Sequence, residues 1–274
     1  DVKSIIKKYP TPSYVYSKQK IIENFKNLEA AFKGVDHLIC FAVKANSNLA
    51  ILNILAKNGA GFDIVSGGEL KRVVAAKGDV EKIVFSGVGK TSEEIKLAIE
   101  KNILAFNVES EDELSRIQEI ANSLNKKASI SIRVNPNVDA KTHPYISTGL
   151  KENKFGVSEE SAFDLYKKAK LLDSIEIEGI DCHIGSQITD LKPFEDSIKK
   201  LIKLVDRLEE EGINIRHIDI GGGIGIRYDD EKTIDFNEYA KIISSQIKER
   251  KIKILMEPGR VITGDAGVIL TKVE

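Results

Sequence analysis

The sequence predicts an α/β protein that folds as a (β/α)8 TIM-like barrel. Short β-branched or apolar runs alternate with amphipathic stretches of about ten to twenty residues along the whole chain. Strict alternation implies a parallel sheet, and eight such units are enough to close a barrel. The alternative is an open doubly wound sheet. Its dinucleotide fingerprint GxGxxG would have to follow an early strand directly, and no such motif stands there.

The expected strands are short runs rich in Ile, Val and Phe. They span residues 38–43, 61–65, 82–86, 104–108, 129–134, 178–183, 215–223 and 252–259. Helices are expected where apolar residues recur with helical spacing. They lie at 18–32, 49–57, 68–76, from about 91, from about 110, and at 159–170, 193–211 and 237–248.

Two of these helices begin with capping signals. Thr91 or Ser92 can cap the helix that opens with TSEE, whose acids suit the positive end of the helix dipole. Ser110 is expected to cap the next helix, with Glu113 completing a capping box. The fifth strand runs into a long loop that includes HPYISTGLKENKFGV (143–157), and a loop of this length indicates a function.

Composition and charge narrow the kind of partner. Lysine and arginine number 41 against 42 acids, so the net charge of −1 provides no general attraction to nucleic acid or anionic lipid. No apolar run has the length of a membrane span, and DVKSIIKKYP lacks the layout of a secretory signal. Cys40 and Cys182 suit reduced core thiols better than a disulfide or a zinc site. We therefore expect a cytoplasmic protein with a small-molecule site, no metal, and no nucleic-acid or membrane partner.

The candidate site residues follow the expected strands at their carboxyl ends, where barrels of this type place their active sites. They are Lys44, Asp63, Arg133, His183, Ser186, Gly221, Gly222, Gly223, Glu257, Gly259 and Arg260. Nearly every polar group in an otherwise apolar strand therefore falls at one rim of the predicted barrel.

Lys44 and the three glycines suggest two parts of one site. A partly desolvated lysine loses some preference for its charged form and can act as an amine nucleophile, as a Schiff base requires. Gly221, Gly222 and Gly223 leave backbone N–H groups unobstructed, so they can form a nest for a phosphate. The alternatives are a lysine that extends from a strand end into solvent and a simple tight turn.

Glu257 and His183 suggest a third part. A carboxylate at the end of the eighth strand can keep a pyridine nitrogen protonated, which makes pyridoxal phosphate a strong electron sink. Glu257 could equally form an ion pair with Arg260. His183 can stack on a ring and shift protons near neutral pH, although a lone histidine at a strand end is more often simply hydrogen-bonded. An amine, phosphate donors and an acid together match one cofactor, pyridoxal 5'-phosphate.

The motifs also carry a family resemblance. They are AVKAN (42–46), GFDIVSGGE (61–69), IRVNP (132–136), KFG (154–156), HIGSQ (183–187), IDIGGG (218–223) and EPGR (257–260). Together they resemble the fold-type III, alanine-racemase-like pyridoxal phosphate enzymes, and among them the diaminopimelate decarboxylase family. The resemblance covers essentially the whole chain, in the same order.

The resemblance implies a role for each candidate residue. Lys44 would hold the cofactor as a Schiff base, His183 would stack on its ring, and Glu257 would face the ring nitrogen. Asp63 and Arg133 would support the lysine and the cofactor. The residues around the phosphate or nearby polar atoms would be Ser186, Gly221, Gly222, Gly223, Gly259 and Arg260. In that family the arginine of EPGR also reaches a substrate carboxylate, so Arg260 is a candidate for substrate binding as well.

The resemblance further implies three parts of the chain. Residues 1–17 would be an N-terminal segment that pairs with a β domain, 18–260 the cofactor-binding barrel, and 261–274 the beginning of a C-terminal β domain that is otherwise absent. In the family that domain supplies a cysteine and acidic motif and a tyrosine, largely across the interface of a homodimer. We therefore expect the 274-residue chain to bind the cofactor but to turn over poorly by itself.

The reaction implied is decarboxylation of meso-2,6-diaminopimelate to L-lysine and CO2, the last step of lysine biosynthesis. Three alternatives stay open: a decarboxylase of the same fold that acts on ornithine, arginine or carboxynorspermidine, a noncatalytic cofactor-handling barrel, and a Schiff-base aldolase. The motif EPGR argues against the noncatalytic barrel. An aldolase would need no acid facing a pyridine ring.

Overall fold

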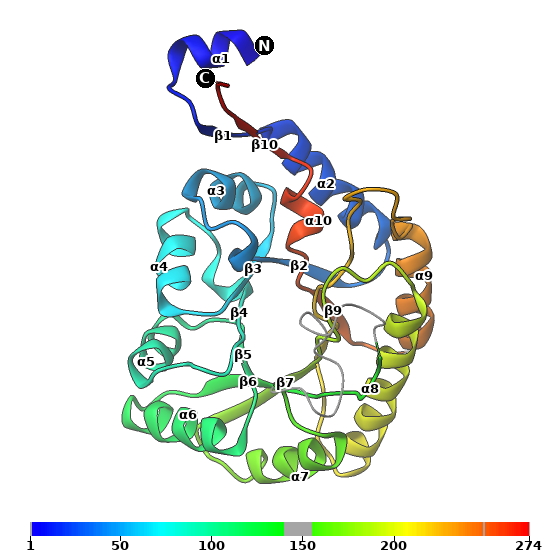
Figure 1. Ribbon diagram of the computed structural model, residues 1–274. Helices are drawn as coiled ribbons and strands as arrows, with labels where there is room; N and C mark the ends of the chain where they lie inside the picture. The colour runs from blue at the N-terminus through cyan, green and yellow to red at the C-terminus, as the bar shows by residue number, and fades with distance from the viewer. Residues whose placement is uncertain (1, 140–154, 249, 274) are drawn as a thin grey trace.

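Eight parallel strands close into a barrel in which each strand neighbours the next in the chain (Figure 1). The structure is a computed structural model that describes residues 2–139, 155–248 and 250–273. The barrel strands are β2 (His37–Ala42), β3 (Gly61–Ile64), β4 (Ile83–Phe85), β5 (Ala105–Val108), β6 (Ala128–Arg133), β7 (Ile175–Asp181), β8 (His217–Asp219) and β9 (Lys253–Met256). Strand β9 pairs with β2 and closes the ring. The predicted (β/α)8 barrel is confirmed.

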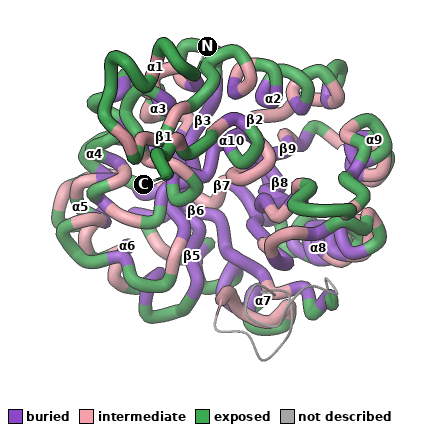
Figure 2. Tube along the Cα trace, turned by 45° about the horizontal axis from the view of Figure 1, so that its top comes forward, coloured by how far each residue is buried: buried purple, intermediate pink, exposed green. Residues whose placement is uncertain are grey.

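Helices cover the outside of this ring. They are α2 (Lys18–Ala31), α3 (Leu49–Lys57), α4 (Gly67–Ala75), α5 (Ser92–Lys101), α6 (Glu111–Ser123), α7 (Glu159–Ala169), α8 (Lys192–Glu210), α9 (Phe236–Ile247) and the short α10 (Arg260–Thr263). Short 3-10 turns occupy Val43–Ala45 (η1) and Val80–Lys82 (η2). The strands are buried, while the outward faces of the helices are exposed (Figure 2). Apolar residues three and four apart, such as Ile198, Leu201 and Val205 on α8, form the face packed on the barrel.

The helix caps differ in one respect from expectation. Thr91 forms a complete capping box with Glu94 at the start of α5. Ser110 caps α6 by accepting from the Glu113 N–H, but the Glu113 carboxylate accepts from the Glu109 N–H and pairs with Lys90. The reciprocal half of the predicted Ser110 capping box is therefore wrong, because a buried lysine draws that carboxylate into the protein.

The two ends of the chain meet outside the barrel. Strand β1 (Ser13–Tyr16) pairs antiparallel with β10 (Gly267–Leu270) in a two-stranded sheet. This ribbon and helix α1 (Val2–Lys8) project away from the ring of strands (Figure 1). The N-terminal segment thus contacts the residues that follow the barrel.

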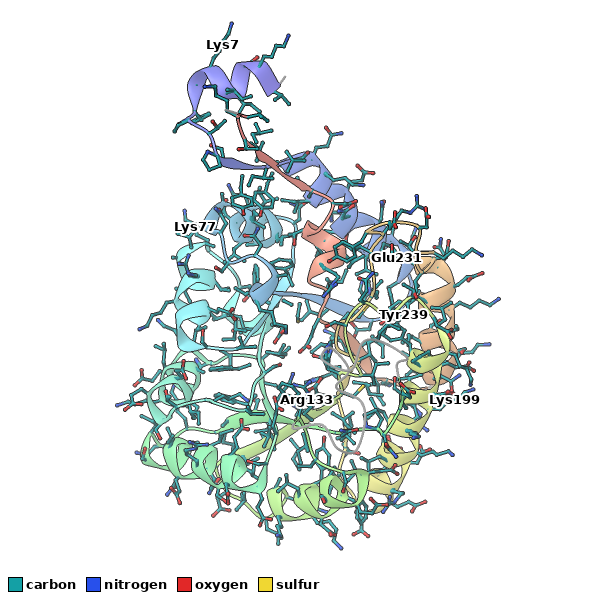
Figure 3. The ribbon with its side chains drawn as sticks, viewed as in Figure 1. Lys7, Lys77, Arg133, Lys199, Glu231 and Tyr239 are labelled. Carbon is teal, nitrogen blue, oxygen red and sulfur yellow. The ribbon has the colours of Figure 1, made fainter. Side chains whose placement is uncertain are left out.

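The interior of the barrel is polar toward the carboxyl ends of the strands. Hydrogen bonds join strands that are not neighbours, such as Asn107 on β5 with Glu257 after β9, and Ser131 on β6 with His217 on β8. Such bonds can only cross the interior. Figure 3 shows Arg133 within the ring of strands and Lys199 outside it on α8. The polar interior is where a ligand's polar groups could be recognised.

Part of the predicted loop lies outside the described residues. HPYISTG and Lys154 fall there, so their expected roles stay predictions. Phe155 and Gly156 are described, and the Phe155 ring centroid lies 5.0 Å from the Arg133 guanidinium. Within the described ranges, no helix is long and apolar enough to cross a membrane.

Candidate active site

Lys44 lies in η1, immediately after β2, and meets the next strand through its side chain. Its Nζ lies 2.6 Å from Oδ2 of Asp63 on β3, which is fully buried, while 51% of the Lys44 side chain is exposed. Burial lowers the pKa of Lys44, but the carboxylates of Asp63 and Glu257 outweigh burial and hold the pKa above its ordinary value. Desolvation therefore favours the neutral amine as expected, but the two acids that face this lysine reverse the net effect and favour its charged form.

A cavity of about 550 Å³ opens beside Lys44 at the carboxyl ends of the strands. Seven of the predicted site residues line it: Lys44, His183, Ser186, Gly223, Glu257, Gly259 and Arg260. Tyr14 and Tyr16 of β1, and Val268 and Ile269 of β10, line its outer side. The four other predicted residues, Asp63, Arg133, Gly221 and Gly222, contact the lining residues or the layer beneath them.

The glycine run is shaped by close backbone approach. Gly221 and Gly223 have positive φ values of 67° and 97°. A Cβ at Gly222 would collide with the Glu257 carbonyl oxygen, and one at Gly223 with that of Gly185. The Gly221 N–H donates to Asp219 Oδ1 at 2.9 Å and the Gly222 N–H to His183 Nδ1 at 3.2 Å. Two of the three predicted phosphate donors are thus engaged within the protein, and Gly223 alone of the three lines the cavity.

His183 follows β7 and is held in one tautomer. A backbone N–H can only donate, so Nδ1 of His183 must be unprotonated to accept from Gly222. Burial, followed by the charges of Arg133 and Lys44, lowers the pKa of His183 well below its ordinary value. His183 is therefore neutral near pH 7. The expected proton transfer by this ring is not what the structure favours, whereas a flat neutral ring suits stacking.

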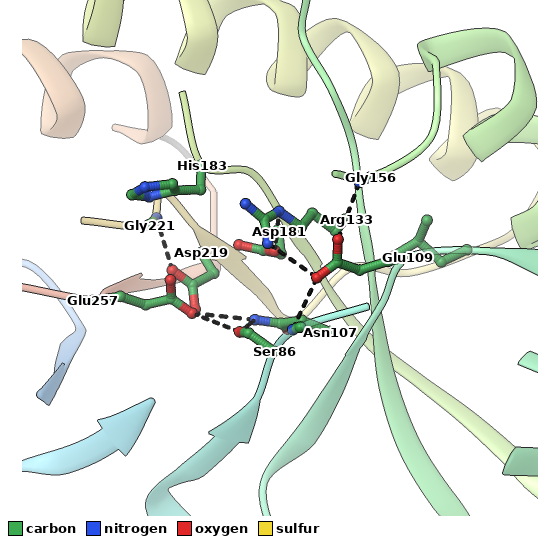
Figure 4. Close-up of polar contacts among 12 residues, drawn as sticks. Ser86, Asn107, Glu109, Arg133, Gly156, Asp181, His183, Asp219, Gly221 and Glu257 are labelled. Carbon is green, nitrogen blue, oxygen red and sulfur yellow. Dashed lines mark hydrogen bonds and ion pairs between the residues drawn. The ribbon is translucent and has the colours of Figure 1, made fainter. Parts of the chain in front are cut away.

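Glu257 follows β9 and forms part of the cavity floor. Its Oε1 accepts from Ser86 Oγ at 3.3 Å and from Asn107 Nδ2 at 3.2 Å (Figure 4). Burial, with the nearby carboxylates of Asp219, Asp63 and Asp181, raises the pKa of Glu257 well above its ordinary value.

The alternative of a rim ion pair between Glu257 and Arg260 does not hold. Arg260 Nη1 instead donates to Gln187 Oε1 and to the Tyr228 hydroxyl, each at 3.1 Å.

Arg133 lies one layer behind the cavity, among acids. Its Nη1 lies 3.0 Å from Glu109 Oε1, and its Nε lies 3.8 Å from Asp181 Oδ2 (Figure 4). Glu109 also accepts from the N–H groups of Gly87 and Gly156. Arg133 therefore links Glu109, after β5, with Asp181 at the end of β7, and Glu109 in turn holds the backbone at Gly156. Arg133 thus supports the site from behind the cavity.

Sequence reasoning missed five residues of this interior: Ser86, Asn107, Glu109, Asp181 and Asp219. A signal was present in the strands themselves. Asn107 interrupts the apolar run LAFNV, and Asp219 interrupts IDIGGG, at positions that alternate with outward-facing apolar residues. A polar residue at an inward position of a barrel strand is therefore a candidate for the site, whether or not it lies within a motif.

These residues fit pyridoxal phosphate. Lys44 offers an amine for its aldehyde, Glu257 lies in the floor for its ring nitrogen, and His183 offers a neutral ring face. The backbone at Gly223 and Gly259 approaches so closely that a Cβ would crowd neighbouring atoms, and Arg260 adds a cation at the same side of the cavity. The donor set matches an anionic, aromatic aldehyde.

Comparison with known proteins decides the family. Residues 18–264 match the family model described as "Pyridoxal-dependent decarboxylase, pyridoxal binding domain". The chain belongs to this family. Pyridoxal phosphate is thus the cofactor of the matched domain, and Lys44, His183 and Glu257 all lie within the matched residues.

Relatives within this family are similar over almost the whole chain. A diaminopimelate decarboxylase of Pseudomonas fluorescens is 54% identical over 272 residues, which are 99% of this chain and 65% of the relative. The crystal structure of diaminopimelate decarboxylase from Helicobacter pylori complexed with L-lysine has a TM-score of 0.96 at 47% identity, covering 98% of this chain and 68% of that one. The crystal structure of a lysine decarboxylase from Selenomonas ruminantium has a TM-score of 0.86 at 26% identity, covering 97% of this chain and 67% of that one. The chain spans about two thirds of the length of these relatives.

Proposed function

We propose that this chain carries the cofactor site of an enzyme that decarboxylates meso-2,6-diaminopimelate, at the centre of D configuration, to L-lysine and CO2. One observation carries the proposal: Lys44, Glu257 and Arg260 line a single cavity in a chain 54% identical to a diaminopimelate decarboxylase. The spacing of an amine, an acid and an anion-binding rim around one cavity is what a pyridoxal-dependent decarboxylation requires.

The chain's own residues bind and orient the reacting groups. Lys44 supplies the amine that would hold the cofactor's aldehyde carbon, and Asp63 fixes the position of that amine by the 2.6 Å contact. His183 presents a neutral ring face that would lie against the cofactor ring, and Glu257 would hold a proton at the ring nitrogen. Bound pyridoxal phosphate supplies an electron-poor ring that accepts the electron pair left when CO2 departs.

A second set of residues lines the side of the cavity that we assign to the cofactor phosphate. We infer that Ser186, Gly223, Gly259 and Arg260 bind the phosphate or nearby polar atoms, with Gly221 and Gly222 shaping the loop behind them. Arg260 is also the candidate for a substrate carboxylate, because its guanidinium lies at the cavity and its described hydrogen bonds go to the uncharged partners Gln187 and Tyr228.

We also propose that the protein works as a homodimer in the cytoplasm. The dimer rests on the family resemblance, and the cytoplasmic location on the two buried free cysteines, Cys40 and Cys182, which suit a reducing compartment. The exposed ribbon of β1 and β10 beside the cavity is the surface where the remaining third of the relatives' length would complete the site.

The test uses the 274-residue chain loaded with pyridoxal phosphate. Wild type should show the visible absorbance of lysine-bound cofactor, and borohydride reduction should fix the cofactor on Lys44. Lys44→Ala should lose the visible absorbance and the cofactor fixed by borohydride, and its turnover rate should fall by several orders of magnitude. Lys57→Ala, at the exposed end of α3, is the matched control and should keep both.

Substrate choice is read from CO2 released in the presence of excess protein over long incubation. We expect slow release from meso-diaminopimelate that is still faster than release from lysine, ornithine or arginine. Faster release from one of the other three would replace the proposed substrate. Cofactor binding without CO2 from any of them would favour a noncatalytic cofactor-handling barrel.

A further inference from the structure

Three buried carboxyl groups crowd the floor beneath the cavity. One oxygen from each of Asp181, Asp219 and Glu257 lies within 4.8 Å of the others. The strand register explains why these three carboxyl groups lie together. Asp181 on β7 pairs directly with Asp219 on β8. The Glu257 N–H donates to the carbonyl oxygen of Gly221, which follows β8. Three negative charges this close in a buried site repel strongly, so full ionisation is unfavourable.

The three acids differ in their partners. Asp181 lies 3.8 Å from the Arg133 guanidinium, which favours its charged form. Burial and the Asp219 carboxylate nevertheless raise the pKa of Asp181, and its Oδ1 has no hydrogen-bond partner among the described residues. Asp219 has no lysine, arginine or histidine nitrogen within ion-pairing distance among the described residues. Its Oδ1 accepts from the Gly221 N–H, while its Oδ2 is buried with no hydrogen-bond partner in the part of the chain that the structure describes. A proton on this Oδ2 would turn an unsatisfied acceptor into a donor toward a neighbouring carboxylate.

Glu257 is the neighbour that can receive that hydrogen bond. Figure 4 shows the carboxyl groups of Asp219 and Glu257 side by side. Ser86 and Asn107 already donate to Glu257 Oε1, and Glu257 lines the cavity whereas Asp219 does not. Glu257 is therefore the member of the pair that can meet a ligand, and Asp219 is the member behind it.

We propose that Asp219 is a positioning residue that shares one proton with Glu257 and takes that proton when a cationic ring nitrogen meets Glu257. The proton stays within the pair, so Glu257 becomes the anion that the ring needs while the buried charge of the pair stays at −1. The shared proton follows from the carboxyl geometry alone; its use in holding the ring rests on the proposed function. Burial, with the charge of Asp63, raises the pKa of Asp219 to about 7 although the Gly221 N–H opposes this, which agrees with a shared proton.

Other groups near the pair set the conditions of the test. The charged or titratable side chains around it come from the neighbouring strands, the residues that follow them, η1 and α9: Cys40, Lys44, Asp63, Glu109, Arg133, Asp181, Cys182, His183, His217 and Tyr239. The variants must therefore remove one proton site while keeping the hydrogen bond that holds the glycine loop at Gly221. Asp219→Asn does so, because the amide oxygen can still accept from Gly221 and the amide nitrogen can donate permanently to Glu257.

Infrared difference spectroscopy of the 274-residue chain without added cofactor tests the shared proton. Near neutral pH, wild type should show the C=O band of one protonated carboxyl group per chain, shifted in D2O. Asp219→Asn and Glu257→Gln should each lose this band. Asp173→Asn, which removes an exposed acid, should keep it. Circular dichroism confirms that each variant is folded.

The cofactor-loaded chain tests the positioning role. Wild type should keep the carboxyl band after loading, because the proton then lies on Asp219, and the pH dependence of its visible absorbance should include a step that Asp219→Asn lacks. A band that survives in Asp219→Asn assigns the proton elsewhere and overturns the inference. Absence of the band in wild type, with a divalent metal found in the protein, would show that a cation neutralises the three acids instead. Because the first measurement needs no cofactor, its outcome is independent of the proposed function.

Discussion

The ion pair of Lys44 with Asp63 makes a prediction about the reactivity of the lysine. Asp63→Asn keeps the shape of the side chain but removes the charge that lies 2.6 Å from Lys44 Nζ. Since Asp63 helps to hold the pKa of Lys44 above its ordinary value, the variant should lower that pKa and increase the fraction of neutral amine at a given pH. The variant lysine should therefore react faster with aldehydes.

The magnitude follows from the exposure of the pair. Two unit charges about 4 Å apart interact by roughly 4 kcal/mol at an effective dielectric constant of about 20. Half of the Lys44 side chain is exposed, so solvent screens the pair and a value of about 1.4 kcal/mol is appropriate. That corresponds to about one pKa unit, or roughly a tenfold change in the neutral fraction.

The assay is reductive alkylation of the cofactor-free chain with a small neutral aldehyde and cyanoborohydride, followed by peptide mass spectrometry. Lys44 in Asp63→Asn should be modified roughly tenfold faster than in wild type below the pKa. Lys57, exposed on α3, is the internal control in the same digest and should not change. An equal or slower rate at Lys44 would refute the reasoning that Asp63 keeps the amine protonated.

Two further predictions concern stability. Lys90→Met should lower the free energy of unfolding by about 3–5 kcal/mol in urea titrations, because Lys90 is fully buried and its loss leaves the Glu113 carboxylate without its cation; Glu113→Gln in the same chain should recover part of the loss. Asp219 binds a proton in the folded state up to a pKa of about 7 and in the unfolded state only up to its ordinary value. Stability should therefore fall as the pH rises through that window, by up to about 1.4 kcal/mol per pH unit, and Asp219→Asn should flatten the slope. Equal slopes in the two proteins would contradict this.

The sequence was sufficient for the architecture because its signals are local. Alternating apolar runs and amphipathic helices specify the strands and helices, and the right-handed parallel connection leaves few ways to arrange them. The polar residues at strand ends, Lys44, His183 and Glu257, could be assigned to one rim for the same reason. Their identity as an amine, a ring and an acid then indicated the cofactor.

The tertiary structure decided what state these groups are in. Whether Lys44 is neutral or charged depends on Asp63 and Glu257, which lie 19 and more than 200 residues away in sequence but face the same interior. The neutral form of His183 depends on a hydrogen bond from the Gly222 N–H. Protonation depends on distance and burial, and neither quantity is written in a local run of residues. The order of residues therefore determined which groups are present at the site, and the closure of the barrel determined the charges they carry.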